Sequence, residues 1–178
     1  MGQIPQLPVV VGSGLERSCA VARSQTTITQ LMAPQDVNLM GNVFGGVILA
    51  AVDRIAYMCA SRHAGRPTVT ASFDQVDFRS PIQIGEVVTL RASVNTVGRT
   101  SMEVGVRVTA ESVQGENQRH TNSCYVTMVA IDQDGHPTEV PRLELETQEE
   151  YRRHHDAEER RAARLRLVAS RRSRRRQY

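Results

Sequence analysis

Apolar side chains occupy nearly every face of one stretch, residues 42–61, at the spacing of a helix. The apolar positions are Val47, Ile48, Ala51, Val52, Ile55 and Met58. A helix that is apolar nearly all round is a buried one. Asn42 is the predicted N-cap, because an asparagine side-chain oxygen accepts a first-turn N–H. Gly65 and the following Pro67 predict the C-terminal end.

Other segments alternate hydrophobic and polar positions, which is typical of strands. Residues 19–32 alternate in part and predict one strand before the helix. After the helix, strands are predicted over residues 68–78, 86–97, 100–113 and 119–132, each bounded by turn-forming residues. Consecutive strands with short turns favour an antiparallel meander. Together with one long apolar helix they predict an α+β domain whose sheet curls round the helix.

Charge divides the chain of 178 residues into unlike parts. Residues 1–151 carry 11 arginines against 16 acidic residues, a net charge of −5. Residues 152–178 carry 11 arginines against 3 acidic residues, a net charge of +8. We therefore expect a flexible arm over residues 1–17, a folded domain over 18–142 and an Arg-rich tail over 143–178. Glu–Arg pairs at helical spacing predict that this tail is a solvated helix with a disordered end.

Several classes of protein are disfavoured by what the sequence lacks. The three cysteines are widely spaced, which suggests neither a disulfide framework nor a metal site and predicts free thiols in the cytoplasm. No apolar run reaches the roughly 18 residues of a membrane helix. The histidines lack zinc-ligand spacing and the serines lack a GxSxG elbow. We expect no metal, no membrane insertion and no serine-triad hydrolase.

Asp53 is the one acid within the predicted buried helix. An ionised carboxylate buried without a partner is costly, so it must be paired, exposed or neutralised. It either pairs with Arg54 or another arginine, faces solvent, or belongs to a functional site, where perturbed carboxylates cluster. The residues alone leave these interpretations open.

Gly45 and Gly46 lie where this helix begins. Without side chains they allow a ligand to approach first-turn N–H groups, which can hold a phosphate or an oxyanion. The alternative is tight packing of a strand on the helix. Asp53 follows Gly45 by eight residues, which is roughly 12 Å along a helix. One subunit would then not bring both groups to one reaction centre, whereas two helices side by side in a dimer could.

The run MAPQDVNLMGNVFGGVILAAVDRIAY resembles the signature of the hotdog-fold acyl-CoA thioesterases. The segments VTASFDQVDFRSPIQIGEVV and VGRTSMEV, and the last strand with VAID and the following VPR, extend the match over about residues 24–142. The resemblance implies a curved antiparallel sheet wrapped round a central helix, with subunits paired edge to edge and often assembled as trimers of dimers. It also implies hydrolysis of a fatty acyl-CoA to free acid and coenzyme A.

The resemblance implies roles for particular residues. The catalytic carboxylate falls on Asp53, and a site asparagine that positions water or substrate falls on Asn42. Gly45 and Gly46 would bind the thioester oxygen through their N–H groups. Phe44 stands where many relatives carry histidine, a difference that bears on substrate preference.

Binding of coenzyme A would involve the GRTS-type segment, here Arg99, Thr100 and Ser101, and as a further candidate Arg79. A thioester is already activated, so a water, a general base and an oxyanion site suffice. We favour that route over direct attack by the carboxylate. No cofactor is expected, because coenzyme A is part of substrate and product.

The architecture and the Arg-rich tail are each compatible with other functions. The same architecture hosts dehydratases and non-catalytic acyl-CoA-binding proteins. Dehydratases of this fold usually use a histidine, and none lies within residues 42–61 of the predicted helix. The 11 arginines of the tail could neutralise nucleic-acid phosphates. However, the tail's only aromatics are Tyr151 at its start and Tyr178 at its end, so a solubilising or partner-binding tail is favoured.

Overall fold

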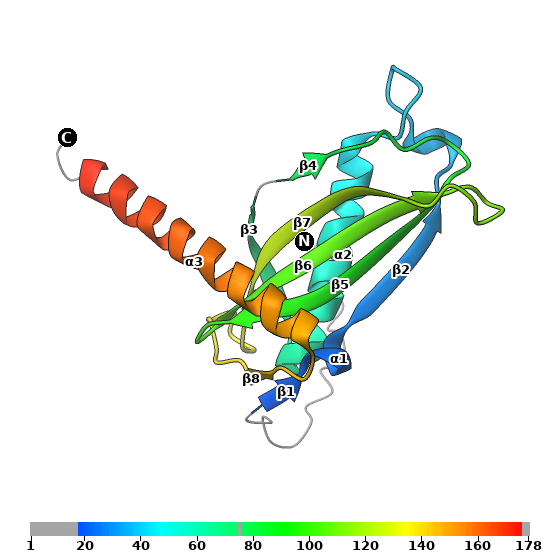
Figure 1. Cartoon of the computed structure of the whole chain (residues 1–178). Helices are drawn as coiled ribbons and strands as arrows, with labels where there is room; N and C mark the ends of the chain where they lie inside the picture. The colour runs from blue at the N-terminus through cyan, green and yellow to red at the C-terminus, as the bar shows by residue number, and fades with distance from the viewer. Residues whose placement is uncertain (1–17, 75, 176–178) are drawn as a thin grey trace.

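The computed structural model describes residues 18–74 and 76–175. A six-stranded sheet follows one side of a long helix, α2 (Gly45–Ala64), and a second long helix, α3 (Gln148–Arg175), crosses its other side (Figure 1). The sheet strands are β2 (Thr26–Leu31), β3 (Thr68–Phe73), β4 (Asp77–Phe78), β5 (Val87–Val97), β6 (Ser101–Glu111) and β7 (Arg119–Ala130). The smaller elements are β1 (Ser18–Ala20), α1 (Val21–Ser24), η1 (Pro34–Asp36) and β8 (Arg142–Glu144).

Helix α2 is the centre of the hydrophobic core. Its fully buried side chains include Val52 and Ile55, which pack with inward-facing residues of β5, β6 and β7 such as Val94, Val104 and Val126. Gly65 ends the helix in the left-handed conformation, with φ of 63°. The predicted buried helix and its C-terminal glycine are confirmed.

The start of α2 differs from the expectation. The N-cap is Phe44, whose side chain makes no capping hydrogen bond, so the prediction of Asn42 as N-cap is wrong. Asn42 instead forms an isolated antiparallel bridge with Gln83. The chain before α2 is therefore extended and paired with the segment around Gln83, and the helix begins only after this pairing.

Every pairing in the six-stranded sheet is antiparallel, in the order β2-β5-β6-β7-β3. Strands β5, β6 and β7 form the predicted meander. Strand β3 precedes β5 in sequence but pairs with β7, so it lies at one edge while β2 lies at the other. The strand expected over residues 19–32 is interrupted by α1, and the one expected over 68–78 is divided into β3 and β4.

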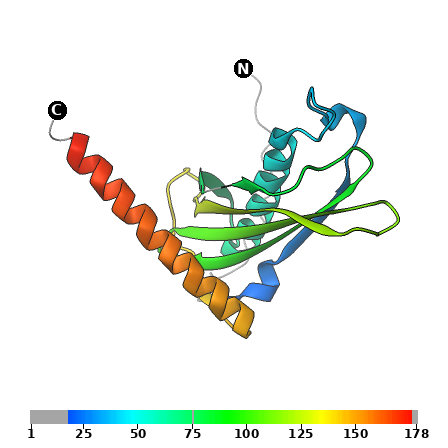
Figure 2. The ribbon, with the colours of Figure 1, turned by 45° about the horizontal axis from the view of Figure 1, so that its top comes forward.

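The tail is more firmly attached than a solvated helix would be. The first half of α3 lies against the outer face of the sheet, and the helix then projects past its edge (Figures 1 and 2). Arg160 and Arg164 donate to the buried carboxylate of Glu103 on β6. Helix α3 is described through Arg175, and the predicted flexible arm of residues 1–17 lies outside the described residues.

The cysteines can be compared with the expectation of free thiols. Cys59 and Cys124 are free thiols, as predicted, and all three cysteines are buried. Among the described residues, no helix is both long enough and apolar enough to cross a membrane.

Candidate active site

Asp53 lies on α2 where that helix faces the edge strand β3. Its Oδ1 accepts a hydrogen bond from Thr70 Oγ1 on β3, at 2.6 Å. The side chain of Asp53 is partly exposed, and within residues 18–74 and 76–175 it makes no ion pair. Pairing with Arg54 is therefore wrong for the described chain. The carboxylate is held by a hydroxyl and retains open lone pairs.

The first turn of α2 presents backbone donors beside two aromatic rings. The N–H groups of Gly45 and Gly46 have no acceptor within the helix, as is general for a first turn. A Cβ on Gly46 would stand 2.4 Å from the ring of Phe44, and one on Gly45 would stand 3.3 Å from the ring of Phe78. The glycines therefore permit close packing, and they also leave first-turn donors uncovered by side chains of their own.

A cavity of about 410 Å³ opens beside this helix start. Three of the predicted site residues, Asn42, Gly45 and Arg79, line it together with Asn38. The Oδ1 atom of Asn42 accepts a bond from Gln83 Nε2 at 2.7 Å. The Oδ1 atom of Asn38 accepts the backbone N–H groups of Met40 and Asn42, at 2.8 and 3.2 Å. The side-chain amides of Asn38 and Asn42 thus line this cavity, each with its Oδ1 already accepting a hydrogen bond.

Apart from Gly46, which follows Gly45 in the first turn of α2, the remaining predicted residues lie elsewhere in the subunit. Asp53 does not line the cavity at the helix start. Arg99 and Thr100 lie in the turn between β5 and β6, and Ser101 is the first residue of β6. The carbonyl of Thr100 accepts the N–H of Ala130, which pairs with the first residue of β3 just after α2 ends. This turn is therefore near the C-terminal end of α2, whereas the cavity is at its N-terminal end.

The edge at β3 suits contact with a second subunit. Val69 and Phe73 on this strand are 45% and 39% exposed, and β3 has no strand on its outer side among the described residues. Tyr57 and Met58 on α2 are exposed as well. An exposed apolar edge strand is a ready template for pairing. Asp53 lies next to this edge, where another copy could supply a helix start.

Sequence reasoning missed Thr70 and Asn38. Thr70 is one of several polar residues in an alternating strand, so the pattern gives no sign that it contacts Asp53. Asn38 lies among turn-forming residues, where asparagine is common. They become recognisable only through their contacts, Thr70 with the carboxylate of Asp53 and Asn38 with two backbone N–H groups near the helix start.

One cluster has metal-like spacing, Asp132, Asp134 and His136. Its Asp132 Oδ1 accepts the N–H groups of Asp134 and His136, at 3.0 and 2.8 Å. Those bonds close a tight exposed turn and account for the clustering. The cluster is apart from Asp53 and the helix start.

Comparison with known proteins identifies the family. A family model described as thioesterase superfamily matches residues 40–116. Protein VdlD of Helicobacter pylori is 40% identical over 144 residues, covering 81% of this chain and 82% of that protein. The uncharacterized acyl-CoA thioester hydrolase YkhA of Bacillus subtilis is 39% identical over 137 residues, covering 77% and 80%. The chain belongs to the hotdog-fold acyl-CoA thioesterase family.

Solved structures agree with this membership. An apo-hexameric acyl-CoA thioesterase superposes with a TM-score of 0.83 at 41% identity, covering 86% of this chain and 99% of that one. An acyl-CoA hydrolase of Staphylococcus aureus, solved with butyryl-CoA, coenzyme A and coenzyme A disulfide, has a TM-score of 0.81 at 33% identity, covering 88% and 96%. Variants of that hydrolase with one aspartate, asparagine or threonine changed to alanine were also solved.

A longer relative is the cytosolic acyl coenzyme A thioester hydrolase of Homo sapiens. It is 35% identical over 135 residues, and the match covers 75% of this chain but 36% of that protein. The hotdog architecture and the thioesterase class expected from the sequence are thus confirmed for this chain.

Proposed function

We propose that this thioesterase hydrolyses fatty acyl-CoA to a free carboxylic acid and coenzyme A, at a site shared between two subunits. The observation that carries the proposal is the partly exposed Asp53 carboxylate, held by Thr70 on β3, which has no strand on its outer side among the described residues. The helix start with its free N–H groups lies more than two turns away in the same subunit, roughly 12 Å along the axis. A second copy supplies the missing half.

The spacing of three residues supports this choice. In the S. aureus hydrolase, the substituted asparagine precedes the substituted aspartate by 15 positions, and the substituted threonine follows it by 17. Asn38, Asp53 and Thr70 have the same separations here. We therefore add Thr70 to the proposed site. We also assign the role of site asparagine to Asn38 in place of the expected Asn42.

The geometry suits general-base catalysis. Thr70 donates to Oδ1 of Asp53, which orients the carboxylate and leaves Oδ2 to take a proton from water. The N–H groups of Gly45 and Gly46 from the other subunit would stabilise the oxyanion. Direct attack by Asp53, through a mixed anhydride, is the alternative route. The reaction needs no cofactor, because coenzyme A leaves with the product.

Cationic side chains near these parts would hold coenzyme A. Arg79 is exposed and lines the cavity at the helix start, where it can meet a phosphate. Arg99, Thr100 and Ser101 would contact coenzyme A from the opposite end of a neighbouring α2. We propose a homodimer as the smallest active unit and a hexamer, a trimer of dimers, as the full assembly. The cytosolic human relative supports a cytoplasmic location.

The deciding experiment measures thiol release from acyl-CoA substrates of different chain length. We expect activity in the wild type and a loss of about 100-fold or more in Asp53→Asn, since general-base catalysis is worth that much. The exposed Asp134→Asn serves as the matched control. Full activity in Asp53→Asn would refute the assigned role. Absence of release from every substrate would instead favour a non-catalytic acyl-CoA-binding protein.

Mixing two inactive variants tests whether the site is shared. Asp53→Asn and Asn38→Ala are combined and allowed to exchange subunits. Mixed dimers contain one intact site of two, and half of the dimers are mixed, so about a quarter of wild-type activity should return. A site within one subunit predicts only the sum of the two residual activities.

A further inference from the structure

Helix α3 continues past the edge of the sheet to which it is bound (Figures 1 and 2). Arg164 pairs with Asp74, the first residue after the edge strand β3. Eleven residues of the helix, 165–175, follow Arg164, which is roughly 16 Å at 1.5 Å per residue. Neighbouring strands lie about 4.8 Å apart, so this distal segment is long enough to cover roughly three further strands.

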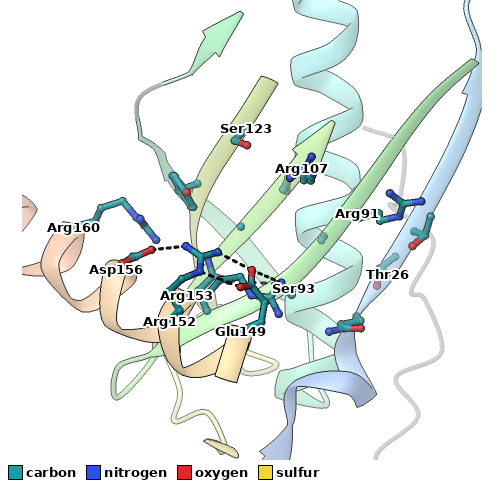
Figure 3. A pocket seen from close by; sticks show the side chains of 17 residues that line it. Thr26, Arg91, Ser93, Arg107, Ser123, Glu149, Arg152, Arg153, Asp156 and Arg160 are labelled. Carbon is teal, nitrogen blue, oxygen red and sulfur yellow. Dashed lines mark hydrogen bonds and ion pairs between the residues drawn. The ribbon is translucent and has the colours of Figure 1, made fainter. Parts of the chain in front are cut away.

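The first half of α3 balances its own charges. Arg152 is paired with both Glu149 and Asp156, as Figure 3 shows. Arg161 lies 3.5 Å from Glu158, one turn earlier in the helix. Opposite charges three or four positions apart stabilise a helix. This half is thus supported by ion pairs of its own as well as by the sheet beneath it.

The distal segment lacks this balance. Residues 165–175 contain five arginines and no acidic residue. Like charges four positions apart, as at positions 171 and 175, destabilise a helix. Leu165 is 61% exposed and follows Arg161 by one turn, and Arg161 lies against Gly98 of the same subunit. The face of α3 that packs on its own sheet therefore continues into a segment whose chemistry suits an acidic partner.

The proposed dimer places a second subunit at the edge over which α3 passes. Two identical β3 strands that pair about a two-fold axis normal to the sheet run in opposite directions, so the end of one faces the start of the other. Asp74, at the end of β3, would therefore stand beside the start of the partner strand. In each subunit that start, Thr68, pairs with Ala130 at the end of β7.

An acidic segment follows directly after this end of β7. Residues 131–141 contain three acids, Asp132, Asp134 and Glu139, and no arginine. Asp134 and Glu139 are exposed. A helix that crosses the dimer edge beside Asp74 would thus carry its unbalanced arginines toward unbalanced acids.

We propose that the distal segment of α3 docks on the second subunit of the dimer, across the β3 edge, with its arginines against the acidic segment 131–141 of that subunit. The inference rests on the proposed dimer. Two-fold symmetry makes each subunit give one helix and receive one, so the contact is made twice. Complementary charges fix the register of an interface and disfavour wrong partners. The two helices would hold together the two halves of each shared catalytic site.

Dissociation of the dimer is measured by analytical ultracentrifugation for the full chain and for a chain that ends at Arg164. We expect the shortened chain to dissociate about tenfold or more readily. Raising salt from about 0.05 to 0.5 M should weaken the full-chain dimer more than the shortened one, because exposed charges are screened. Circular dichroism checks that the shortened chain is folded.

Substitution of the acidic segment gives a second test. Glu139→Gln should weaken the full-chain dimer and leave the shortened chain unchanged, since the two changes remove the same contact. Glu116→Gln, in the exposed turn between β6 and β7, is the matched control and should change neither. Equal effects of Glu139→Gln in both chains would overturn the assigned contact.

Cross-linking locates the segment directly. A photo-reactive group on Leu165→Cys should join this position to residues 131–141 of the partner, as mass spectrometry of mixed isotope-labelled and unlabelled chains would show. The same group on His155→Cys, in the first half of α3, should give no link between subunits. Links from Leu165→Cys only within one subunit would overturn the proposal.

The outcomes separate this proposal from that of the shared site. A full chain that is monomeric refutes the dimer and this inference with it. A dimer of equal affinity with and without residues 165–178 overturns this inference alone. So does loss of only the larger assembly, or loss of DNA binding as the only effect, because the segment then serves another partner. Well above the dimer dissociation constant, the shortened chain should retain thiol release, since no proposed catalytic residue is removed.

Discussion

Glu103 holds α3 against the sheet, and its replacement should release this helix. The side chain is 1% exposed and accepts bonds from Arg160 at 2.7 Å and Arg164 at 3.1 Å. Arg164 also pairs with Asp74, and the guanidinium of Arg160 lies 3.6 Å from the ring centroid of Tyr125. The buried carboxylate of Glu103 therefore anchors two arginines of α3 to the sheet.

The expected cost follows from burial. Removing one member of a fully buried ion pair costs about 3–5 kcal/mol, because the other charge is left uncompensated. Arg160 and Arg164 are each 26% exposed, so water can solvate them in part. We therefore expect Glu103→Ala to lower the free energy of unfolding by about 2–3 kcal/mol. Glu103→Gln keeps the shape and one acceptor, and should cost about 1–2 kcal/mol.

The measurement is urea unfolding followed by circular dichroism at one fixed protomer concentration, because assembly adds stability that depends on concentration. Glu116→Gln, in an exposed turn, is the control and should change little. Trypsin should also cut α3 faster in Glu103→Ala, since release opens its arginines. A loss below about 0.5 kcal/mol, or no coupling to Arg160→Met in a double-mutant cycle, would refute this account.

Three further predictions concern buried or crowded groups. Burial lowers the pKa of His63. The unfolded chain therefore binds this proton more readily, so stability should fall as pH drops below about 6.5. His63→Gln should reduce that fall in unfolding curves between about pH 7 and 5, and the exposed His155→Gln should not. Burial raises the pKa of Cys59 to about 12, so this thiol should resist alkylation in native protein at pH 8. Mass spectrometry measures the labelling, and rapid alkylation of Cys59 would contradict this prediction. Gly46→Ala should displace the Phe44 ring and lower kcat for thiol release by about tenfold or more, whereas unchanged kcat would separate this glycine from catalysis.

Local patterns were sufficient for the central helix and the long strands of this protein. Apolar residues at helical spacing predicted α2, and Gly65 ended it in the left-handed conformation as expected. Alternation located most of the strands, because side chains of a strand point alternately to its two faces. Asp53 was also recognised as unusual from the local pattern, because it is the one acid in an apolar helix.

The sequence by itself thus identified the main elements of the hotdog fold, the family and Asp53 as the candidate catalytic residue. The tertiary structure decided which segments meet: β3 pairs with β7 across the sheet, and Thr70 thereby reaches Asp53. It also bound α3 across the sheet through Glu103 and Asp74. Periodicity reports only which face of an element is apolar, whereas strand partners and ion pairs join residues that are distant along the chain. Such pairs leave no mark in the local pattern.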